Sequence, residues 1–133
     1  MSALATALES LVTGIQTYSV KVPPSPVYPY VLLNASLPSP NDRGLSREPQ
    51  TVTGRIRATV VSFDAVSVRW GCGKVMDSLE GARPDVAGWN IGRVENVPND
   101  QPMLVDTDVF ITNRGNPVYQ PMDFLVVASQ LTQ

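Results

Sequence analysis

Few residues of this chain belong to the types that carry out chemistry. The chain has 133 residues, with no histidine and one cysteine, Cys72. A catalytic thiol normally needs a base, most often histidine, to form its thiolate. We therefore expect Cys72 to be a small buried apolar residue without a disulfide partner. The sequence predicts neither enzyme activity nor a bound cofactor.

The segment Gly71-Cys72-Gly73-Lys74 faintly resembles a phosphate-binding loop. It lacks the first glycine of that motif and the Ser or Thr that should follow the lysine, and it lies inside a predicted helix. We predict no phosphate site here. The two glycines, each costing a helix about 1 kcal/mol, instead indicate a close helix–sheet approach or a kink.

A pair of carboxylates could in principle hold a cation. Asp106 and Asp108 are two residues apart in a predicted strand, so their side chains should lie on the same face. Exposed acidic residues on a wet sheet face are far commoner, and the chain has no pair of cysteines for a structural zinc site. No metal site is predicted.

The charged residues are better candidates for protein contacts. Arg55 and Arg57 share one strand face, where they are either solvated or paired with acids of a neighbouring subunit. The polar segment 38–50 is long for a loop in a compact domain. This length favours an arm that contacts a neighbouring subunit over a hairpin that only extends into solvent. The candidate interface residues are Asp42, Arg43, Arg47, Glu48, Arg55, Arg57 and Arg114.

The element that must position the two arginines is a strand from Thr51 to Val61. Its residues alternate between apolar and polar, the pattern of a strand with one dry and one wet face. Asp64 then offers an N-cap for a helix over 64–80 with a single apolar stripe, and Gly81 offers a left-handed stop.

The rest of the chain supplies a second helix and further strands. The predicted segments are a helix over 1–15 covering one sheet face or shared with a neighbouring subunit, strands over 28–37, 89–94, 103–112 and 122–129, and a turn over 113–117. These elements predict an α+β fold with a mostly antiparallel four- or five-stranded sheet and helices packed on one face. The residues expected in the core include Ile56, Val60, Val68, Met76, Leu79 and Val126.

Composition limits the class of protein. The chain is 43% apolar and 17% charged, which argues against wholesale disorder and suits one domain over residues 1–133. A net charge of −2 does not provide the excess of basic residues that binding to nucleic acid requires. The longest apolar run, over 124–128, is far short of the ~20 residues that cross a bilayer. We expect a soluble protein made in the cytoplasm.

The order of these elements resembles the tail terminator (tail completion) proteins of long-tailed bacteriophages. The resemblance rests on the VYPYVLL strand, on the unit GRIRATVVSFDAVSVRWGCGKVMDSLEGARPDVAGW and on the closing strands, and it covers nearly the whole chain. Its most family-like piece is LEGARPDVAGW. The turn-rich region 99–121 departs from the family pattern and indicates a longer hairpin that reaches a neighbour.

The resemblance implies a structural virion protein without catalytic residues. It implies a homohexameric ring at the head–tail junction, in contact with the tail tube protein and with a head–tail connector or stopper protein, through which duplex DNA passes without specific binding. No membrane partner is implied. The alternatives are another head–tail joining or tube protein, and a small ligand-binding domain or enzyme.

Overall fold

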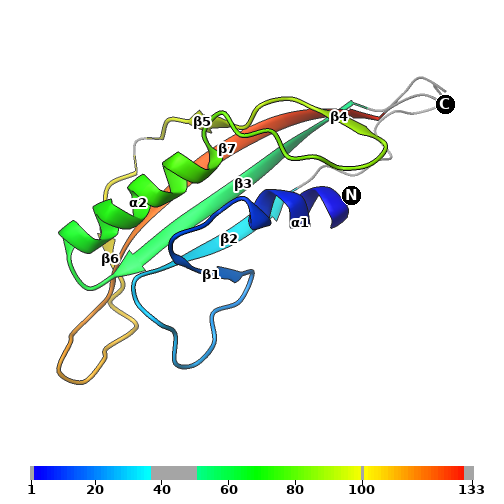
Figure 1. Cartoon of the computed structure of the whole chain (residues 1–133). Helices are drawn as coiled ribbons and strands as arrows, with labels where there is room; N and C mark the ends of the chain where they lie inside the picture. The colour runs from blue at the N-terminus through cyan, green and yellow to red at the C-terminus, as the bar shows by residue number, and fades with distance from the viewer. Residues whose placement is uncertain (1, 37–50, 100, 131–133) are drawn as a thin grey trace.

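The computed structural model describes residues 2–36, 51–99 and 101–130. In these ranges it has two helices on one face of a mixed seven-stranded sheet (Figure 1). The predicted α+β class is confirmed. The elements are α1 (Ser2–Ser10), β1 (Gln16–Ser19), β2 (Tyr30–Ser36), β3 (Thr51–Ser62), α2 (Ala65–Leu79), β4 (Trp89–Ile91), β5 (Glu95–Val97), β6 (Leu104–Val105) and β7 (Val118–Gln130).

The sheet is larger than the four or five strands expected. Its order is β1-β2-β3-β7-β4, and β5 and β6 also pair with β7. The pairing of β1 with β2 is parallel, whereas the other strand pairs are antiparallel. The two strands that were not predicted, β1 and β5, have four and three residues. Strands so short do not show a clear alternating pattern in the sequence.

The long antiparallel pair β3–β7 forms the centre of the sheet. It pairs residues from Thr51 with Ser129 to Ser62 with Val118. The alternation predicted for β3 is confirmed, since every second residue from Val52 to Val60 is buried. These residues face the helices and, with Phe124 and other apolar side chains of β7, form the core.

Both ends of α2 follow the chemistry read from the sequence. The Asp64 side chain caps the helix, because its Oδ1 accepts the N–H of Ser67 at 2.7 Å. This hydrogen bond holds the pKa of Asp64 below its ordinary value. The helix ends at Leu79, and Gly81 adopts the left-handed φ of +77° that favours glycine.

The buried stripe of α2 differs from the expected one at two positions, because Cys72 and Met76, both expected to be buried, are only partly buried. Val68, Gly71, Val75 and Leu79 are buried, whereas Met76 is only partly buried against the core. Residues 68, 71, 75 and 79 repeat at spacings of three and four, so Val75 rather than Met76 falls on the stripe.

Gly71 allows the close approach of α2 to the sheet. A Cβ at this position would lie 2.5 Å from Cγ1 of Val60 and 3.0 Å from Cδ1 of Ile15. Gly73, two residues on, faces open space. The close-approach interpretation of the glycine pair is therefore confirmed for Gly71 alone.

The prediction of a strand over 103–112 is wrong for all but two of its residues. Only Leu104 and Val105 pair with β7. The next residues turn away because Oδ1 of Asp106 accepts the N–H of Asp108 at 3.1 Å, a local side-chain turn that competes with a strand. Asp106 and Asp108 therefore do not share a strand face. The turn predicted over 113–117 is confirmed, with Gly115 at φ +89°.

Helix α1 is shorter than the predicted helix over 1–15. Its last residue is Ser10, and the chain reverses at Gly14, where φ is +84°. Leu8 and Val12 are buried against the sheet, so the segment covers one sheet face as expected. Neither helix in the described ranges is long and apolar enough to cross a membrane.

Candidate interaction surface

The sheet face turned away from the helices carries the polar residues of the three long strands. Because side chains alternate along a strand, the residues between the core positions lie on this open face. Strand register places Asn34, Arg57 and Asp123 side by side in one row across β2, β3 and β7. The next row holds Ser36, Arg55 and Leu125.

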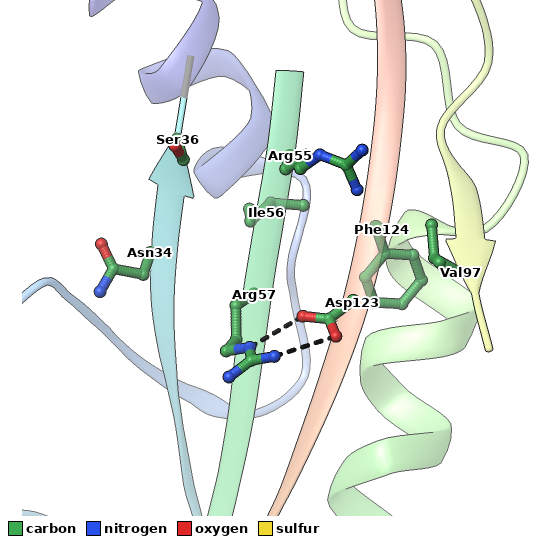
Figure 2. A pocket seen from close by; sticks show the side chains of 8 residues that line it. All are labelled: Asn34, Ser36, Arg55, Ile56, Arg57, Val97, Asp123 and Phe124. Atoms are coloured by element: carbon green, nitrogen blue, oxygen red, sulfur yellow. Dashed lines mark hydrogen bonds and ion pairs between the residues drawn. The ribbon is translucent and has the colours of Figure 1, made fainter. Parts of the chain in front are cut away.

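Arg57 and Asp123 form a bidentate ion pair at the centre of the open face. Nε of Arg57 donates to Oδ1 of Asp123 at 2.8 Å, and a terminal guanidinium nitrogen donates to Oδ2 at 3.1 Å (Figure 2). The hydrogen bonds from Arg57 are the main reason that the pKa of Asp123 is lowered. The pKa of Arg57 is raised in return. The pair fixes the positions of both side chains.

Two asparagines in and after β5 also donate to Asp123, one to its carboxylate and one to its backbone oxygen. Nδ2 of Asn99 donates to Oδ2 of Asp123 at 3.0 Å, and Nδ2 of Asn96 donates to the Asp123 backbone oxygen at 3.1 Å. The segment that follows α2 therefore contacts the open face through β7. Asp123 accepts hydrogen bonds from two directions, which makes it the best-connected side chain on this surface.

A shallow hollow of about 300 Å³ lies around this ion pair. Arg55, Asn34 and Ser36 contribute polar groups to its lining. Figure 2 shows Arg55 extending toward β7, whereas Arg57 reaches the carboxylate of Asp123. Among the described residues, Arg57–Asp123 is the only ion pair. Arg55 forms no ion pair with a carboxylate of the described segments, although its charge also helps to lower the pKa of Asp123.

The groups on this surface are those of recognition by hydrogen bonds and ion pairs. A guanidinium can bind a carboxylate through two parallel hydrogen bonds, and the neighbouring amide and hydroxyl add further donors and acceptors. Together they could bind an acidic side chain of another protein.

Arg114 lies elsewhere. Its guanidinium is 4.1 Å from the ring centre of Phe63 and 5.8 Å from that of Tyr28. This stacking joins the loop after β6 to the segment before β2 and to the residue that follows β3. Arg114 thus takes part in a cation–π contact within its own chain.

Of the other sequence-predicted sites, Cys72 is half-buried in α2, and burial raises the pKa of its thiol. The Gly71–Lys74 segment lies within α2, as predicted. In the described ranges, no group of three or more Cys, Asp or Glu residues is placed to hold a metal ion.

The candidate interface residues thus fall into three groups. Arg55 and Arg57 share the open face, as predicted, and Arg114 lies apart from them. The other four, Asp42, Arg43, Arg47 and Glu48, lie outside the described residues.

The sequence interpretation missed Asp123, which organises the open face. The signal was a single carboxylate at the start of the mostly apolar strand predicted over 122–129, whereas β7 begins at Val118. Its meaning depends on the β3–β7 register, which brings it opposite Arg57. That register joins residues 66 positions apart and cannot be read from local patterns.

The chain was compared with known proteins. No family model matches it, and neither does any curated protein. Among solved structures, it is similar to a chain in the virion of a native gene transfer agent (GTA) particle, with a TM-score of 0.58 and 14% sequence identity. The match covers 96% of this chain and 92% of the other. The two chains share a fold. Because almost all of both chains is matched, the likeness extends over the helices and the sheet together.

Proposed function

We propose that this chain is a structural protein of a virion. The observation that carries the proposal is the shared fold with a chain of a GTA virion over nearly the full length of both. The chemistry of the open face supports it, since ion-pairing and hydrogen-bonding groups suit a subunit contact. In this proposal the protein is not an enzyme.

We further propose that the chain is a tail terminator. The sequence resemblance to that family supports this role, which needs a closed ring of subunits, most simply six. Closed rings use heterologous contacts, in which one surface of a subunit meets a different surface of the next. The open face with Arg55 would form one side of that contact. The ring would cap the tail tube and contact the head–tail connector or stopper protein.

The test is the position of the protein in the particle. Virions carrying this chain with a small electron-dense label should show one labelled ring at the head–tail junction. Loss of the protein should leave tails of uncontrolled length that do not join heads. Native mass spectrometry of tail ends should give a hexamer.

A second candidate is another head–tail joining protein or a tube protein. The shared fold supports it equally, because the GTA match is to a chain of a whole virion. Label distributed along the tail would favour the tube subunit. Label at the junction combined with tails of normal length in the deletion mutant would favour a joining protein. Absence of the protein from purified virions would contradict all of these roles.

A further inference from the structure

A second cavity lies on the open face, at the end of the sheet where β2 begins. Its volume is about 220 Å³. Strand register places Tyr30, Val61 and Tyr119 in one row across three strands, and Leu32 and Thr59 in the next. These side chains form its floor. The second row separates the cavity from the Arg57–Asp123 pair.

The loop after β6 forms the rim of this cavity. Asp106, Val109 and Pro117 line it from that loop, and Tyr28 lines it from the segment before β2. The backbone N–H of Asp106 donates to the Pro117 backbone oxygen at 2.8 Å, and the Asn116 side-chain amide donates to the Asp106 backbone oxygen at 3.2 Å. These bonds tie the two ends of the loop together, so the rim is formed without a ligand.

The cavity combines aromatic walls with one carboxylate. Burial is the main cause of the raised pKa of both Tyr28 and Tyr30, and the Asp106 charge adds to it, whereas Arg114 lowers the pKa of Tyr28. The pKa of Tyr30 is raised to about 12. Asp106 is half-buried and forms no ion pair with another described residue.

This set of groups selects for a positive charge. The face of an aromatic ring carries negative potential and attracts ammonium and guanidinium groups, and a nearby carboxylate adds to that attraction. Part of the same aromatic cluster already holds one cation, since the Arg114 guanidinium stacks on Phe63 and Tyr28.

The size of the cavity decides between kinds of ligand. Sites for small molecules usually have about 300–1,000 Å³. A cavity of about 220 Å³ is below that range and suits a single long side chain. We propose that it binds an arginine or lysine side chain projecting from a partner protein. The cavity is present in the isolated chain, so its binding can be tested without ring assembly and apart from the proposed virion role.

The test uses the isolated chain and small probes. N-acetyl-arginine amide should shift the backbone NMR signals of Val61, Asp106 and Val109 in a saturable way. N-acetyl-citrulline amide, the uncharged isostere, should produce no saturable shift at these residues. N-acetyl-lysine amide reports whether an ammonium is accepted as well.

Two matched variants assign the binding to the cavity. Asp106→Asn keeps the side-chain oxygen that accepts from the Asp108 N–H but removes the charge. It should weaken arginine amide binding by about two- to fivefold, the usual effect of a partly exposed ion pair. Asp108→Asn, on an exposed residue outside the cavity, should leave binding unchanged.

The proposal is overturned by any of three results. They are the absence of saturable shifts with both the arginine and lysine probes, equal binding of the citrulline probe, and unchanged affinity in Asp106→Asn with a native spectrum. None of these results bears on the position of the protein in a virion, so the two proposals fail separately.

Discussion

At the scale of single residues, Asp123 links the two halves of the chain. Its carboxylate binds Arg57 of β3 and Asn99 beyond β5, and its backbone oxygen binds Asn96. The folded chain holds its pKa below the ordinary 3.8. A carboxyl group with a lowered folded-state pKa stabilises the fold above its unfolded-state pKa. That contribution disappears as the pH falls through the folded-state pKa.

We predict a pH-dependent loss of stability in Asp123→Asn. At pH 7 the free energy of unfolding should fall by up to about 1 kcal/mol, because the pair is partly exposed and screened by solvent. Urea unfolding at pH 7 and at a pH well below 3.8 measures the effect. The difference from wild type should shrink at the acidic pH. Asp85→Asn, at an exposed carboxylate without an ion pair to the described residues, is the control.

At the scale of elements, the contact of α2 with the sheet rests on one missing side chain. Gly71 lies where any Cβ would overlap Val60, whose fully buried, β-branched side chain has little freedom to move. Gly73 lies on the same helix with open space beside it. Substitutions at Gly71 and Gly73 therefore test core packing and helix propensity separately within one turn of α2.

Alanine at these two positions should have opposite effects. Gly71→Ala should destabilise the fold by about 1–3 kcal/mol, the usual cost of overpacking a core. Gly73→Ala should stabilise it by up to about 1 kcal/mol through the higher helix propensity of alanine. Thermal and urea unfolding of both variants measure this. A Gly71→Ala variant as stable as wild type would contradict the close packing of α2 on β3.

The elements that the sequence predicted well are those with enough residues to show a period or a cap. β3 displays five cycles of alternation, and α2 has both the Asp64 cap and the Gly81 stop. By contrast, β1, β5 and β6 acquire their strand conformation from pairing with longer neighbours. Local propensity does not determine such segments, since tertiary context decides their conformation.

The candidate surface was predicted only in part for a related reason. The common face of Arg55 and Arg57 follows from strand alternation alone. The partner of Arg57, and the cavity between Tyr30 and Asp106, depend on which strands pair and in which register. Asp106 was placed on a strand because its flanking residues alternate, whereas its own side chain forms a turn with Asp108.

At the scale of the whole molecule, the open face should decide assembly. We predict that Arg55→Glu impairs ring formation, because it places a carboxylate where an acidic group of the neighbour is expected, and like charges oppose association. Native mass spectrometry under conditions in which the wild-type chain assembles measures the loss. Arg83→Glu, at an exposed arginine beyond α2, is the control for charge. Unimpaired assembly of Arg55→Glu would remove this face from the proposed contact.

The charge distribution also predicts how the protein behaves toward DNA. The net charge is −2, and Asp123 already neutralises one of the two arginines on the open face. Tight binding to a duplex requires several phosphate contacts by basic residues. We therefore expect no measurable binding to duplex DNA at physiological salt, by fluorescence anisotropy. Binding that weakens steeply as salt is added would instead indicate a DNA-handling protein.

The short strands at the borders of the sheet have a further consequence, for solubility. Open borders of sheets are templates for adding strands from other molecules, and long flat borders lead to fibres. Here β1, β4, β5 and β6 offer runs of only four, three, three and two residues. No such run gives a foreign strand a continuous ladder. These four borders should therefore not seed amyloid-type aggregation, even in concentrated protein.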